Sequence, residues 1–86
     1  MTFKLRSEEL EWKQIDDEIV ALDARRAEYL SIEGSGTSLW HALLTGATRS
    51  ELVDSLIARY GIDEERAGAD VDVFVADLAA KGLLAG

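Results

Sequence analysis

The side chains of this chain that could perform chemistry are scattered and lack partners of the right type. His41 is the only histidine and there is no cysteine, so neither a Ser-His-Asp set nor a thiolate zinc site can be assembled. Asp70 and Asp77 lie two helical turns apart, and the neighbouring Glu64 and Glu65 point in different directions on a helix. We therefore expect no catalytic residue and no metal site.

A glycine pair is the remaining candidate for binding a small anion. Gly34-Ser-Gly36 precedes a predicted helix, where backbone amides can cradle a phosphate. The segment lacks the third glycine, the lysine and the preceding parallel strand of a nucleotide site. We interpret it as a turn followed by a helix start.

The size and composition of the chain favour one small globular domain spanning residues 1–86. Of its 86 residues 48% are hydrophobic and none is proline. A domain of this size buries only about 60 to 65% of its unfolded surface, which leaves little room for a catalytic cavity. No apolar run resembles a signal peptide or a membrane span, so we expect a cytoplasmic protein that does not contact a membrane.

The first third of the chain is predicted to form an antiparallel meander. Leu10–Ile15 and Glu18–Asp23 flank a two-residue turn at Asp16-Asp17, and Arg26–Ile32 follows after the short Ala24-Arg25 connection. One face of such a sheet should pack against helices while the other is partly solvated.

The rest of the chain is predicted to form three helices that end at glycines. The first contains Leu39, Trp40, Leu43 and Leu44 and ends at Gly46. Thr48 to Glu51 fits a capping box for the second helix, which ends at Gly61. Asp63 should cap the third, which runs to about Lys81. The fold class is thus α+β, a three-stranded antiparallel sheet followed by a three-helix bundle with a winged helix-turn-helix outline.

Aromatic residues should supply much of the core of so small a domain. We expect most of them to be buried, with Tyr29 and Phe74 also available to a ligand. They are Trp12, Tyr29, Trp40, Tyr60 and Phe74.

The last helix presents two different faces. Ala67, Val71, Phe74 and Leu78 recur at the helical period and should lie on the core. The neighbouring row mixes one apolar side chain with charges of both signs, which is unusual for a helix that only covers a core. That row is Asp70, Val73, Asp77 and Lys81.

The third predicted strand is an outer strand of the meander, so it offers unpaired backbone amides and carbonyls to a partner strand. Arg26–Ile32 contains no proline that would prevent such pairing. If the last helix packs beside it, the two elements form a groove for an extended peptide. An unpaired edge is also an ordinary feature of small sheets.

The net charge argues against nucleic acid as the partner. The chain has 17 acidic and 9 basic residues, for a net charge of −8, and affinity for DNA comes largely from lysine and arginine. If the last helix were a DNA-recognition helix, its first turns would meet base edges and phosphates. Those turns carry five acidic residues and one basic residue, Arg66. A winged-helix regulator is therefore the weaker alternative.

The order and spacing of several motifs resemble the PqqD-like family, the small domains called RiPP recognition elements, which bind leader peptides of ribosomally made and post-translationally modified peptides. The similarity extends over roughly residues 10–84. Its residues are Glu18–Asp23, Tyr29, Gly36–Trp40, Leu43-Leu44, Gly46, Glu51-Leu52, Tyr60, Asp70-Val71, Phe74, Leu78 and Gly82–Leu84.

The resemblance implies that a leader peptide adds as a strand to the third strand, beside the third helix. The contacts that it implies are Arg26, Ala27, Glu28, Tyr29 and Leu30 on the strand and Asp70, Val73, Phe74, Asp77 and Lys81 on the helix. The chain looks most like stand-alone lasso-peptide B1 proteins, which pass the precursor to a separate leader peptidase of the B2 type and then to a cyclase. A PqqD-type chaperone for a quinone-cofactor precursor remains the alternative, and neither implies catalysis or a cofactor.

Overall fold

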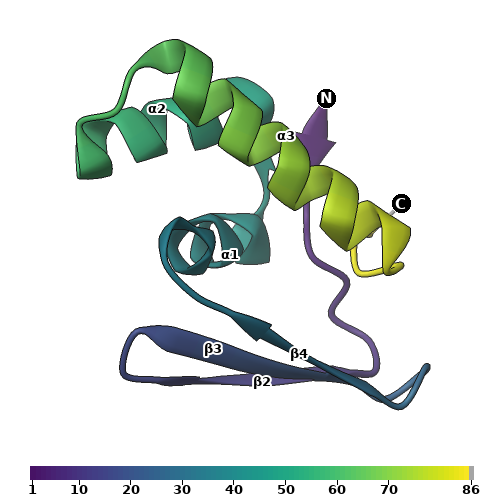
Figure 1. Ribbon diagram of the computed structural model, residues 1–86. Coiled ribbons are helices and arrows are strands. Elements are labelled where there is room, and N and C mark those ends of the chain that lie inside the picture. The colour runs from purple at the N-terminus through teal and green to yellow at the C-terminus, as the bar shows by residue number, and fades with distance from the viewer. Residues whose placement is uncertain (86) are drawn as a thin grey trace.

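A three-stranded sheet lies beneath three helices in the computed structural model, which describes residues 1–85 (Figure 1). The first helix, α1, lies between the sheet and the other two helices in this view. The elements in chain order are β1 (Thr2–Phe3), β2 (Leu10–Ile15), β3 (Glu18–Asp23), β4 (Glu28–Ile32), α1 (Ser35–Thr45), β5 (Ala47–Thr48), α2 (Arg49–Tyr60) and α3 (Glu64–Ala80). The expected fold class is confirmed.

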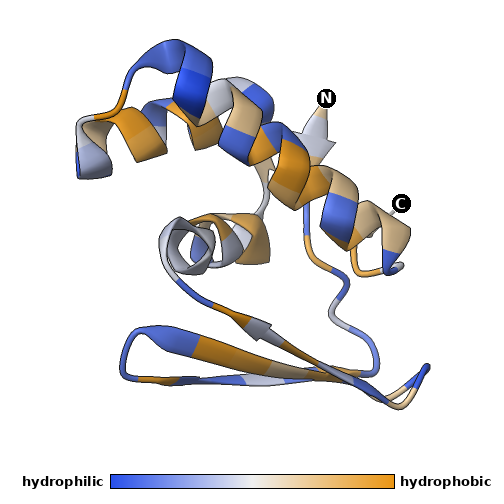
Figure 2. Ribbon diagram, viewed as in Figure 1, coloured by the Kyte–Doolittle hydropathy of each residue, from blue (hydrophilic) through white to orange (hydrophobic). Residues whose placement is uncertain are grey.

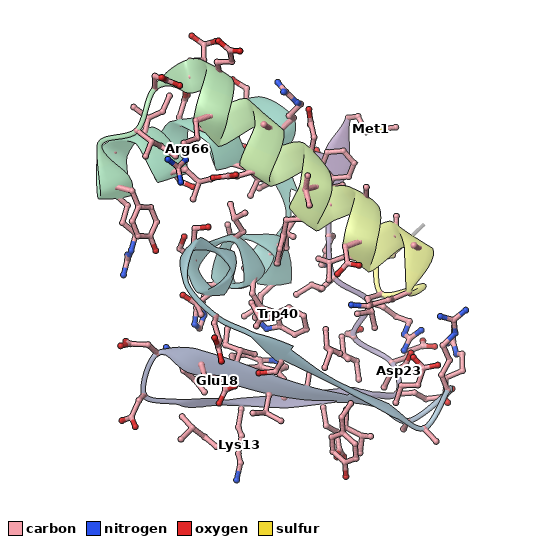
Figure 3. All side chains as sticks on the ribbon, viewed as in Figure 1. Met1, Lys13, Glu18, Asp23, Trp40 and Arg66 are labelled. Carbon is pink, nitrogen blue, oxygen red and sulfur yellow. The ribbon has the colours of Figure 1, made fainter. Side chains whose placement is uncertain are left out.

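The sheet is antiparallel with the order β2-β3-β4, and its two faces differ in burial. Along β3, Ile19, Ala21 and Asp23 are buried, while the residues between them are half-exposed. Because successive side chains alternate between faces, the register places Leu30 and Ile32 of β4 on the same inner face. The outer face points away from the helices, as Lys13 shows in Figure 3.

The strand β4 begins two residues later than predicted. Arg26 and Ala27 belong to the turn that joins β3 to β4, and Ala27 has a φ of 56°. A residue in this left-handed region cannot continue an extended strand, and alanine gives no sequence signal for it. The expected strand start at Arg26 is therefore wrong, whereas the boundaries of β2 and β3 are confirmed.

Side-chain caps set the starts of α2 and α3. Thr48 accepts from the amide of Glu51 at 3.1 Å while the Glu51 carboxylate accepts from the amide of Thr48 at 2.8 Å, so the predicted capping box is present. Asp63 accepts from the amide of Arg66 at 2.8 Å, as expected. Gly61 ends α2 in the left-handed conformation.

The core lies between the inner face of the sheet and the three helices. Figure 2 shows hydrophobic segments on β3 and on all three helices. Trp40 is fully buried between α1 and the sheet (Figure 3). Phe74 is half-buried. The expectation that most of the five aromatic residues are buried is wrong, because Trp12, Tyr29 and Tyr60 are exposed.

Both chain ends pack beside the bundle. The short strand β1 pairs with β5, and Leu5 forms an isolated antiparallel bridge with Leu84. Leu83 is buried, so the segment after α3 folds back onto the core as expected. Within residues 1–85, none of the helices has both the length and the apolar character needed to cross a membrane.

A buried ion pair joins the first segment of the chain to the sheet at the turn before β4. Arg6 donates to Asp23 at 2.5 Å and to the carbonyl of Gly82 at 2.9 Å. Burial alone would raise the pKa of Asp23. The hydrogen bond and positive charge of Arg6, with the amides of Arg25 and Arg26, outweigh it and lower the pKa below its ordinary value.

Asp23→Asn is expected to lower the stability of the fold in a pH-dependent way. A carboxylate with a lowered folded-state pKa stabilises the protein above its unfolded pKa of about 3.9, and this contribution is lost as the pH falls through the folded-state value. The urea midpoint of Asp23→Asn should therefore be well below that of the unmodified chain at pH 7, and the two should converge at acid pH. Asp72→Asn, which breaks an exposed pair with Arg49, is the control and should lower the midpoint less. A constant difference between Asp23→Asn and the unmodified chain at every pH would contradict this role of Asp23.

Candidate functional site

The strand β4 is an open edge of the sheet within the described chain. It pairs with β3 on one side, and among residues 1–85 no strand pairs with its other side. In an antiparallel ladder, alternate residues direct their amides and carbonyls to each side, so half of those on β4 point outward. β4 contains neither proline nor lysine, two residues that commonly protect an edge from pairing.

A groove lies between the end of β4, the start of α1 and the face of α3. Its volume is about 450 Å³. The residues that line it are Ile32, Glu33, Ser35, Gly36, Leu39, Asp70, Val73, Phe74 and Asp77. Its floor is apolar, with carboxylates from both walls around it.

Helix geometry places the α3 wall. Asp70, Val73, Phe74 and Asp77 are spaced i, i+3, i+4 and i+7, so they share one face of α3. Val73 is 71% exposed, so most of this apolar side chain is left uncovered within the described chain. Lys81 follows one turn later and donates to Asp77 at 2.9 Å.

Gly36 brings the strand and helix walls together at the floor. A methyl group added at Gly36 would lie 2.8 Å from Cγ2 of Ile32 and 3.0 Å from Cε1 of Phe74. All three residues therefore meet at one place, and a larger side chain at position 36 would displace them. Gly36 therefore allows close packing. Gly34 is the N-cap of α1, so the expected helix start at Gly34-Ser-Gly36 is confirmed.

A much smaller pocket of about 20 Å³ continues along β4 toward the turn. Glu28, Tyr29, Leu30 and Lys81 contribute to it, together with Asp23 and Leu83. Arg26 donates to the carbonyl of Lys81 at 3.0 Å, which holds the turn against the end of α3.

The predicted contact residues thus fall into three groups. Asp70, Val73, Phe74 and Asp77 line the groove. Glu28, Tyr29, Leu30 and Lys81 line the small pocket. Arg26 and Ala27 lie in the turn and line neither of them, and Tyr29 also borders a hollow on the outer face of the sheet.

Five groove residues were not predicted, and all lie at the end of β4 or at the start of α1. They are Ile32, Glu33, Ser35, Gly36 and Leu39. Ile32 continues the inward alternation of β4, a signal that could have extended the predicted site by two residues. The others come together with α3 only through tertiary packing.

The single histidine and an ion pair between α2 and α3 make structural contacts outside the groove. His41 interacts through Nε2 with Oε1 of Gln14 at 2.7 Å and packs edge-on against the ring of Trp12. Arg49 bridges α2 to α3 through two contacts with Asp72, at 2.7 and 3.1 Å, and this pairing lowers the pKa of Asp72. Across residues 1–85, no three side chains of the metal-ligating types are arranged so that they could hold a metal ion.

Comparison with known proteins identifies a family and two similar structures. The family model described as coenzyme PQQ synthesis protein D (PqqD) matches residues 18–84. A comparison with curated proteins finds no match. Among solved structures, TbiB1 in complex with the TbiA(beta) leader peptide is 32% identical, with a TM-score of 0.87 over 96% of this chain and 95% of that one. A lasso peptide synthetase B1 complexed with the leader peptide is 26% identical, with a TM-score of 0.84 over 98% of each chain.

Proposed function

Since this chain belongs to the PqqD family, as a RiPP recognition element similar to lasso-peptide B1 proteins, we propose that it binds the leader peptide of a ribosomally made precursor. The observation that carries the proposal is the unpaired edge of β4 next to the groove on α3. Both similar solved structures hold a leader peptide, which supports the same class of ligand here.

The leader adds to β4 as a further antiparallel or parallel strand. Its backbone completes the hydrogen bonds that β4 leaves open, which provides affinity with little dependence on sequence. Every second side chain of the added strand then points toward α3, where Val73 and Phe74 offer apolar contact. The groove therefore provides the specificity.

The domain acts by presenting the precursor and performs no reaction itself. It holds the leader for a separate leader peptidase of the B2 type, and the processed peptide then passes to a cyclase. Residues 1–86 work as one peptide-recognition domain in the cytoplasm, where precursor synthesis takes place. Neither nucleic acid nor a membrane is a partner in this role.

A second candidate function is that of a peptide chaperone in quinone-cofactor biosynthesis. The matching family model is described as a coenzyme PQQ synthesis protein, which is the observation in favour of this pathway. The same groove would then hold a different precursor peptide.

Isothermal titration calorimetry tests the proposal directly. The TbiA(beta) leader is titrated into the chain, with a scrambled peptide of the same composition as the control and a quinone-cofactor precursor peptide as a second ligand. We expect the leader to bind at micromolar concentrations and the scrambled peptide to bind far more weakly. Equal binding of the leader and the scrambled peptide, or no heat from either natural peptide, would overturn the proposal. Preference for the quinone-cofactor precursor would favour the chaperone.

A further inference from the structure

The charges around the groove are all of one sign. Glu33 contributes a carboxylate from the strand side, and Asp70 and Asp77 contribute carboxylates from α3. No lysine or arginine of the described chain lines the groove. The groove is therefore a place of negative potential with an apolar floor.

Only one of these three carboxylates has a cationic partner. Lys81 pairs with Asp77 at 2.9 Å, and no ion pair within residues 1–85 involves Glu33 or Asp70. Arg66 lies one turn before Asp70 on α3 but forms no ion pair with it in this part of the chain. Two negative charges of the groove thus remain uncompensated.

Besides Asp77, three carboxylates of the described chain take part in ion pairs. Asp23 pairs with Arg6, Asp72 pairs with Arg49, and a longer contact of 3.8 Å joins Glu9 to Arg25. Most of the 17 acidic residues form no ion pair, so what distinguishes Glu33 and Asp70 is their position beside the apolar floor of the groove.

The apolar floor fits the alkyl part of a long cationic side chain. Lysine and arginine carry alkyl stems that pack on apolar surface while the charged head reaches a polar rim. Val73 is exposed beside the ring of Phe74, and an aromatic face attracts a cation as well. The floor and the rim thus select the same kind of side chain.

We propose that the peptide segment recognised by the groove carries a lysine or arginine whose stem packs on Val73 and Phe74 and whose charge is paired by Asp70 and Glu33. This inference rests on the proposed leader-binding function and adds the chemical class of the side chain that is recognised. Strand addition fixes the backbone, and this side chain fixes the register of the peptide along β4.

The test is a selection from a phage-displayed library of random peptides of about twelve residues, long enough to span β4 and its flanks. The unmodified chain is compared with a variant that carries Glu33→Gln and Asp70→Asn, substitutions that keep shape and remove charge. The matched control carries Asp17→Asn and Asp54→Asn, two exposed acids that do not line the groove. Selected peptides are then measured by fluorescence anisotropy at low and high salt, with the TbiA(beta) leader as competitor.

We expect lysine or arginine to be enriched at one position of the peptides selected by the unmodified chain and by the control. The enrichment should disappear with the groove variant. Peptides selected by the unmodified chain should bind the groove variant about five-fold more weakly, and their affinity for the unmodified chain should fall with added salt.

Two outcomes overturn the inference in different ways. In the first, the leader displaces the selected peptides, but these show no enrichment of lysine or arginine, or the groove variant selects the same enrichment. That result refutes recognition of a cationic side chain and leaves the proposed leader binding intact. Failure to select any peptide that the leader displaces refutes the proposed function and the inference together.

Discussion

Val73→Lys is expected to weaken leader binding strongly while leaving the domain folded. Val73 is 71% exposed on α3, so its replacement disturbs little of the core. The lysine would lie between Asp70 and Asp77, at the i−3 and i+4 positions, where its ammonium occupies the negative groove. Loss of the apolar contact together with the misplaced charge should weaken binding by about 2 kcal/mol or more, which is about 30-fold or more.

Ala76→Lys is the matched control for this experiment. It adds the same charge to the same helix at an exposed position that does not line the groove. Calorimetry should show near-normal binding by Ala76→Lys, and circular dichroism should show the same helix content for both variants. Normal binding by folded Val73→Lys would place the leader site elsewhere.

Phe74→Ala is expected to affect both binding and stability. The ring is half-buried and meets Ile32 and Gly36 at the floor of the groove. Truncation of a fully buried phenylalanine costs about 3 to 5 kcal/mol, so a half-buried one should cost roughly 1.5 to 3 kcal/mol. The affinity for the leader should also fall by at least about ten-fold, because the floor is lost.

Phe74→Leu separates these two effects. Leucine keeps most of the buried apolar volume, so the urea midpoint should fall only slightly, by an equivalent of less than about 1.5 kcal/mol. Affinity should fall by an intermediate amount because the aromatic face is gone. If folded Phe74→Ala bound the leader as tightly as the unmodified chain, Phe74 would not be part of the leader-binding site.

Local sequence patterns were sufficient for most of the elements. The two-residue turn at Asp16-Asp17 separated β2 from β3, and capping chemistry at Thr48 and Asp63 gave the starts of α2 and α3. These signals depend on a few neighbouring residues, so they survive without knowledge of tertiary structure. The predicted start of β4 was wrong because Ala27 adopts a left-handed conformation, which an alanine in the sequence does not indicate.

Burial of aromatic residues was predicted less well, for a physical reason. Hydrophobicity alone placed Trp12 and Tyr29 in the core, but Trp12 lies on the outer strand β2 and Tyr29 points to the outer face of the sheet. The exposure of each side chain depends on which face of the sheet the helices cover and how far they extend over it, and tertiary packing sets both. Only Trp40, on the helix between sheet and bundle, is fully buried.

The α3 wall of the groove was predictable and its floor was not. The mixed row on α3 followed from helical spacing alone. The contact of Gly36 with Phe74 joins segments far apart in the chain, so no spacing rule could have brought them together.

The central claim is that a leader peptide pairs with the open edge of β4. Amide hydrogen exchange measured residue by residue by NMR, with and without a saturating leader peptide such as that of TbiA(beta), tests it most directly. We predict that alternate amides within Glu28–Ile32 become strongly protected when the leader binds, because only those facing outward gain a partner. A leader that binds while the β4 amides exchange at unchanged rates, with protection appearing on other elements instead, would contradict the account.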